Sequence, residues 1–117
     1  LYLAFGRAVY PDAVFEGAKA LLTEAAASVT QEELARFAIM AQGAENFDIT
    51  GDLAKITCPV LVIGSEDDRV LGADASRQIA AGLKGSAHCE LYMYNGYGHA
   101  AYDCAPDYQE RIRNFLV

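Results

Sequence analysis

The sequence predicts an α/β fold: a partial parallel sheet with its helices, preceded by a helical segment. Two observations carry this prediction. From residue 50 onward the pattern runs strand, helix, strand, helix, which is typical of one βαβ unit with a closing helix. Residues 1–49 are instead rich in alanine, and their apolar residues recur at helical spacing. We therefore divide the chain into residues 1–49 and residues 50–117.

The first part carries signals for two helices. Asp12 can cap a helix over about residues 13–27, whose apolar side chains follow the three- and four-residue spacing of one face. Thr30 begins a second helix, because Thr30 and Glu33 have the spacing of a capping box. Gly43 stands where a glycine commonly ends a helix.

The second part carries the strands. Residues 59–64 form a continuous apolar run without alternation, which is typical of a strand buried on both faces of a parallel sheet. We expect a helix over about residues 73–84 with its apolar side chains inward, and a second strand over residues 89–94. The inward side chains of the helix are Ile79, Ala80 and Leu83. Pro106 then opens a last helix with an apolar face of Tyr108, Ile112, Phe115 and Leu116.

Length, composition and charge exclude several classes of protein. A chain of 117 residues that is 53% hydrophobic allows one domain with a core. The net charge of -7 argues against binding nucleic acids or anionic membranes, because both need a basic surface. No apolar run approaches the roughly 18 residues of a membrane span. The start, residues 1–5, is too short for a signal peptide and lacks a basic residue.

The cysteines give no sign of a disulfide or a metal site. They are odd in number and widely spaced, and they form no C-x-x-C pair: Cys58, Cys89 and Cys104. We expect them to be buried, reduced thiols, which suits a cytoplasmic protein.

Two polar loops follow the two strands. Acidic residues occupy 66–68 after the first strand, and His99 ends the loop after the second. The carboxyl ends of parallel strands open onto one sheet edge, so these loops should face each other. A carboxylate that binds one ring nitrogen of a histidine leaves the other free as a general base. The alternative is that the acids cap the next helix and the histidine is an ordinary surface residue.

The two loops also carry a family resemblance. Residues 56–70, ITCPVLVIGSEDDRV, resemble the "cPvLvi" strand and "G-x-x-D-x-x-v" loop that bear the catalytic acid in the α/β-hydrolase superfamily. Tyr97-Gly98-His99 resembles the family's histidine loop, and residues 106–116 resemble its C-terminal helix. The resemblance covers residues 50–117 and implies the C-terminal βαβα of that fold. Residues 1–49 are compatible with the helical cap, or lid, that many members insert.

The resemblance assigns roles to two residues. Asp68 is the triad acid if Ser65 takes the place of the loop glycine, and Asp67 is the alternative if Gly64 does. Glu66 is assigned to solvent. His99 is then the general base, and Asp68 orients it. We expect an Asp68 oxygen about 2.6–3.2 Å from His99 Nδ1.

The family's nucleophile has no counterpart in this sequence. It sits in a G-x-S-x-G turn upstream of the acid, and no serine here lies in such a turn: Ser28, Ser65, Ser76 and Ser86. The start on an apolar Leu1 adds to the expectation of a C-terminal fragment of a serine-type hydrolase acting on an ester or similar acyl bond. We expect this fragment to be inactive alone. No cofactor or metal is implied.

The sequence leaves alternatives for the function, the partners and some side chains. The alternative function is a non-catalytic module that binds a partner through its exposed sheet edge. Self-association, as a dimer, or pairing with the absent half is expected because two strands do not make a stable open sheet. A small-molecule acyl substrate is expected for the parent protein. A magnesium site at the paired aspartates is a minor alternative. The tyrosines near the second strand are core aromatics or pocket lining: Tyr92, Tyr94, Tyr97 and Tyr102.

Overall fold

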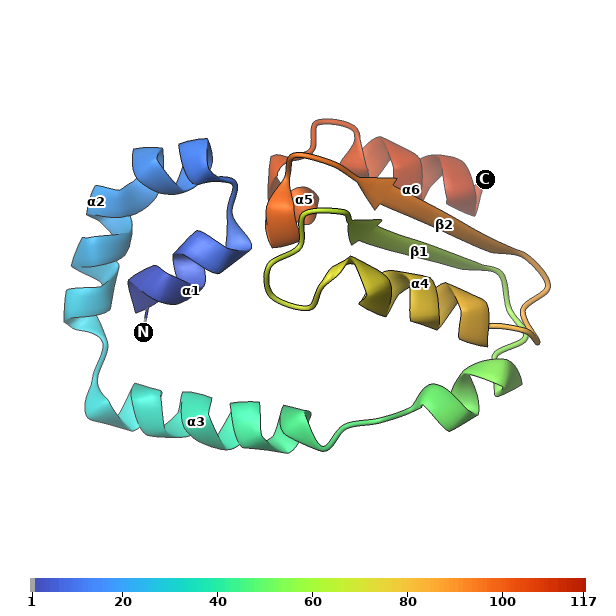
Figure 1. Ribbon diagram of the computed structural model, residues 1–117, viewed down its shortest axis with the longest axis horizontal. Helices are drawn as coiled ribbons and strands as arrows, with labels where there is room; N and C mark the ends of the chain where they lie inside the picture. The colour runs from blue at the N-terminus through green and yellow to red at the C-terminus, as the bar shows by residue number, and fades with distance from the viewer. Residues whose placement is uncertain (1) are drawn as a thin grey trace.

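The computed structural model describes residues 2–117, with the backbone alone at Tyr2. It combines helices with a two-stranded parallel sheet, which confirms a mixed α/β class (Figure 1). In chain order the elements are α1 (Tyr2–Val9), α2 (Asp12–Ser28), α3 (Gln31–Glu45), η1 (Thr50–Lys55), β1 (Val60–Ser65), α4 (Ala73–Gly82), β2 (Cys89–Tyr94), η2 (Gly98–Ala100), α5 (Ala101–Cys104) and α6 (Tyr108–Leu116).

The first three helices form an arm beside the sheet (Figure 1). The helix α1, which the sequence reading did not predict, packs on α2, and Val9 and Phe15 are buried there. The end of α1 also contacts η2, so this arm reaches the loop that follows β2. After α2, α3 runs along the bottom of the view in Figure 1, and most of its side chains are exposed.

The predicted ends of these helices are partly right. The capping box is confirmed, because the Glu33 amide donates to Thr30 Oγ1 and the Thr30 amide donates to Glu33 Oε2. Asp12 does not cap α2: it is the first helical residue, and its carboxylate binds a side chain elsewhere. Gly43 does not end α3, which continues to Glu45 before Asn46 closes it.

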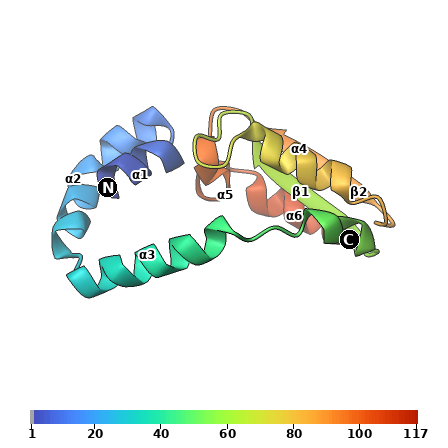
Figure 2. The same ribbon diagram turned by 60° about the horizontal axis from the view of Figure 1, so that its bottom comes forward.

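The sheet brings the ends of both strands to one edge. β1 and β2 pair in parallel, in register from Val60 opposite Cys89 to Ser65 opposite Tyr94. Side chains alternate between two small cores, because successive residues of a strand point to opposite faces. Leu53, Val62 and Leu83 form the core on the α4 side, and Tyr94, Ala101 and Ala105 form the other. Figure 2 shows α4 on one face of the sheet and α6 on the opposite face.

Several predicted buried positions are exposed. Ile79 of α4 and Leu116 of α6 face solvent, and β1 is mostly half-buried rather than fully buried. The physical reason is that only one strand pairs with β1, so the sheet offers little area to cover these side chains. Cys58 and Cys89 are exposed as well, which corrects the expectation of buried thiols, and all three cysteines are free. Within residues 2–117, no helix combines the length and apolarity needed to cross a membrane.

Candidate active site

The loops after β1 and β2 start side by side. The Glu66 amide donates to the Tyr94 carbonyl over 2.8 Å, which extends the strand pairing by one step. Beyond this hydrogen bond the two segments separate: the acidic loop continues from β1, and the histidine loop continues from β2. The two polar segments therefore meet at one sheet edge, as the parallel order predicts.

Asp68 and His99 are in direct contact across this edge. His99 Nδ1 lies 2.9 Å from Asp68 Oδ2, inside the expected range, and both side chains are largely buried. The other carboxylate oxygen, Oδ1, accepts the amides of Val70 at 2.7 Å and Leu71 at 3.0 Å. An ionised carboxylate can only accept, so Nδ1 carries the hydrogen and Nε2 of the neutral ring is left as the acceptor. This is the tautomer that a general base needs.

The pKa of the Asp68 carboxyl lies below its ordinary value of 3.8. Burial is the largest single influence and opposes ionisation, but the hydrogen bonds from His99, Leu71 and Val70 together outweigh it. Asp68 is therefore ionised near neutral pH. Because the folded-state pKa is the lower one, the carboxylate stabilises the fold above pH 3.8, and this contribution is lost as pH falls through the lowered pKa.

This contact predicts a titration result. In a carbon NMR titration we expect the Asp68 carboxyl to have its midpoint below 3.8. His99→Ala should raise that midpoint, because it removes the strongest of the interactions that favour the charged form. His88→Ala is the control, since His88 pairs with Glu90 at an exposed site and should leave the midpoint in place. An Asp68 midpoint unmoved by His99→Ala would contradict the contact.

Asp67 binds the backbone of the histidine loop. Its Oδ1 accepts the Gly96 amide at 3.1 Å, and its Oδ2 accepts the Gly98 amide at 3.0 Å. Gly98 has a φ of +59°, and a Cβ there would meet the Val9 carbonyl oxygen at 3.1 Å, so only glycine suits this position. Asp67 thus anchors the loop while Asp68 contacts the ring. The sequence predicts Asp67 only as the alternative acid and does not predict that it binds the backbone of the histidine loop.

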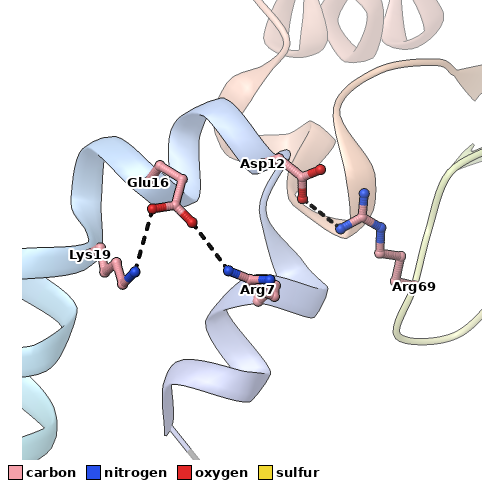
Figure 3. A network of polar contacts seen from close by, with 5 residues as sticks. All are labelled: Arg7, Asp12, Glu16, Lys19 and Arg69. Carbon is pink, nitrogen blue, oxygen red and sulfur yellow. Dashed lines mark hydrogen bonds and ion pairs between the residues drawn. The ribbon is translucent and has the colours of Figure 1, made fainter.

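The alternative prediction, that these acids cap the next helix, is wrong. α4 begins after Gly72 without any side-chain cap. Glu66, assigned to solvent, is exposed but makes two contacts with Arg77 Nη2 of α4, at 2.5 and 2.6 Å. Arg69 donates to Asp12 over 2.8 Å and so links the acidic loop to the start of α2 (Figure 3).

The nearby tyrosines divide into two groups. Tyr94 is buried and makes edge-on contacts with Tyr92 and Tyr97, with ring centroids 4.8 and 5.6 Å apart. These three are core aromatics. Tyr102 instead lies edge-on to His99, with centroids 6.5 Å apart, and lines a cavity.

The cavity lies between the helical arm and His99. It has a volume of about 570 Å³, and His99, Tyr102, Tyr10 and Glu33 supply its polar groups. Its other walls are the apolar side chains of Phe5, Val9, Leu22, Val29, Leu34 and Phe37, together with Gly6. The sequence predicts Leu22, Leu34 and Phe37 on the apolar faces of the two helices of residues 1–49, but it does not predict that they line a cavity. The four-residue spacing of Phe5 and Val9 was a signal for the α1 wall.

The described residues offer neither a metal site nor a nucleophile at His99. Among residues 2–117, no group of three or more His, Cys, Asp or Glu side chains is arranged to hold a metal ion. The carboxylates of Asp67 and Asp68 are already occupied by hydrogen-bond donors, which disfavours the magnesium alternative. Ser65 is buried, and its Oγ has no hydrogen-bond partner in this part of the chain.

Comparison with known proteins shows a similarity to a hydrolase. The chain is 34% identical over 66 residues to a 2-hydroxy-6-oxononadienedioate/2-hydroxy-6-oxononatrienedioate hydrolase of Klebsiella pneumoniae subsp. pneumoniae. The match covers 56% of this chain and 22% of that protein. No protein-family model and no solved structure matches the chain. The chain therefore resembles part of a hydrolase and spans about a fifth of the length of this curated relative.

Proposed function

We propose that this chain supplies the acid and the general base of a serine-type hydrolase that cleaves an ester or similar acyl bond. The observation that carries the proposal is the 2.9 Å contact between Asp68 and His99, at the sheet edge and beside an apolar cavity. The similarity to a hydrolase agrees with it, as does the resemblance of residues 50–117 to the acid and histidine loops of α/β-hydrolases.

In this mechanism His99 carries the proton. Its Nε2 accepts the hydrogen of a serine hydroxyl as the oxygen attacks the acyl carbon, and it then gives that hydrogen to the leaving oxygen. Asp68 keeps the hydrogen on Nδ1 and stabilises the imidazolium that forms between the two steps. Water then attacks the acyl-enzyme with the same help from His99, which releases the acid and restores the serine.

We propose that the nucleophile and the oxyanion hole come from residues outside this sequence. No serine or cysteine here stands in a G-x-S-x-G turn, and the chain covers only 22% of the similar hydrolase. On this proposal residues 1–49 are the cap, and the sheet edge left open beside the β1–β2 pair is completed by the missing segment or by a second copy. The alternative function, a non-catalytic binding module, would use the same open edge.

The two functions predict different results in an ester assay. We expect the 117-residue chain alone to hydrolyse p-nitrophenyl acetate no faster than its His99→Ala variant. With a nucleophile-bearing segment present, in the same chain or added separately, turnover should appear and depend on His99 and Asp68. A binding module gives no turnover in either case. Turnover by the chain alone that Ser65→Ala abolishes would contradict the proposal that the nucleophile lies elsewhere.

A further inference from the structure

We infer that the cavity beside His99 takes an uncharged, apolar acyl group and discriminates against an acyl group that ends in a carboxylate. The inference rests on the proposed function, because it assigns the cavity to the acyl part of the substrate. It also separates this chain from its relative, whose name describes a hydrolase of a nonadienedioate, an ion with two carboxylates.

The first argument is the composition of the walls. Most of the cavity is lined by apolar side chains, and none of the lining residues in the described chain is Lys or Arg. Among the described residues that line the cavity, only His99 has a basic nitrogen, and in the proposed mechanism that nitrogen serves the reacting bond. A carboxylate at the far end of the substrate would leave water for an apolar wall without gaining a partner, which is strongly unfavourable.

The second argument is that the nearby cations are already paired. Arg7 of α1 and Lys19 of α2 both contact Glu16, at 3.2 and 3.6 Å (Figure 3). Arg36 of α3 pairs with Glu32. These are the three basic residues of positions 1–49, which also hold seven acidic residues. The arm that covers the cavity is therefore negative, and it repels an anionic substrate.

The third argument is the charge of Glu33, the one carboxylate among the lining residues that the structure describes. It accepts the backbone amide and the hydroxyl of Thr30, both at 2.8 Å. These hydrogen bonds, the backbone one first, hold the pKa of Glu33 below its ordinary value of 4.5. Glu33 is therefore negative near neutral pH and adds to the repulsion of a carboxylate-ended chain.

The test compares two substrates of equal length. They are p-nitrophenyl octanoate and the mono-p-nitrophenyl ester of octanedioic acid, which differ only at the far end of the acyl chain. With the enzyme assembled with its nucleophile segment, we expect kcat/KM to be at least about 100-fold higher for the octanoate. Equal kcat/KM values, or a preference for the dioic ester, would overturn the inference.

Two variants of α3 locate the effect in the cavity. Phe37→Lys places an ammonium in the wall, so it should reduce the preference at least about tenfold by raising turnover of the dioic ester. Ile39→Lys adds the same charge at an exposed position outside the lining and should leave the preference unchanged. If the two variants change the preference equally, the cavity does not discriminate between the two ends of the acyl chain.

A binding measurement separates this inference from the proposed function. If neither ester is hydrolysed, the proposed function fails, and the cavity is then tested with the 117-residue chain alone. The probes are 1-octanol and 8-hydroxyoctanoate, followed through backbone amide shifts of the lining residues in NMR. Tighter binding of 1-octanol, lost in Phe37→Lys and kept in Ile39→Lys, supports the inference. Equal binding of the two probes overturns it.

Discussion

His99→Ala in the assembled enzyme is expected to lower kcat for ester hydrolysis by about 10⁴-fold or more, because it removes the group that carries the proton. KM should change little, since the apolar walls of the cavity stay in place. The measurement is steady-state turnover of p-nitrophenyl octanoate, with the folded state of the variant checked by its thermal unfolding.

The chain supplies its own control for this variant. His88 also pairs with a carboxylate, at 2.6 Å from Glu90, but both side chains are exposed and lie outside the cavity lining. His88→Ala should therefore leave kcat unchanged. Full turnover by the His99 variant, or an equal loss in the two variants, would contradict the assignment of His99 as the base.

Asp68→Asn tests the same proton transfer from the other side. The amide nitrogen of an Asn can donate to Nδ1, which favours the tautomer with its hydrogen on Nε2 and removes the base. We expect the variant to fold and kcat to fall by up to about 10⁴-fold. A variant that keeps full activity would show that Asp68 does not orient His99.

The sequence predicts best those contacts that follow directly from the order and direction of the strands. The second strand is found over the predicted residues 89–94, and the first begins one residue later and ends one residue later than its apolar run. Once both strands are known to be parallel, the meeting of the acidic loop with the histidine loop follows, because the loops leave the same edge. The capping box at Thr30 is equally local and is confirmed.

The features that the sequence does not predict correctly depend on contacts between segments that are distant in the chain. Aspartate is a residue type that commonly caps helices, but the carboxylate of Asp12 binds Arg69, which is 57 positions away. Ile79 has the spacing of an inward residue, but burial requires more sheet than two strands provide. The cavity needs α1 and α3 to meet His99, and no local pattern encodes that meeting. Asp67 and Asp68 have separate roles because their side chains point in different directions. Two adjacent residues of the same type give no sequence signal for this difference.

Asp67→Ala is also expected to have a large effect, because two amides of the histidine loop lose their acceptor together. The Gly98 amide is part of a buried residue, and leaving such a donor unpaired costs about 1–3 kcal/mol of unfolding free energy. The freed loop also displaces His99, which follows Gly98 directly. A misplacement of about 1 Å can lower the rate by about 100-fold, so kcat should fall more than KM rises.

The controls for Asp67 distinguish a positioning role from a loss of charge. Glu66→Ala removes the same charge one residue earlier and breaks only an exposed pair with Arg77, so kcat should stay close to that of the parent enzyme. Asp67→Asn keeps a carbonyl oxygen that can accept one of the two amides, so it should recover part of the lost kcat. If Asp67 were instead the triad acid, Asp67→Asn would lower kcat as far as Asp67→Ala, and Asp68→Asn would leave it nearly unchanged. Comparing kcat in these four variants therefore decides which aspartate orients the histidine and which one holds its loop.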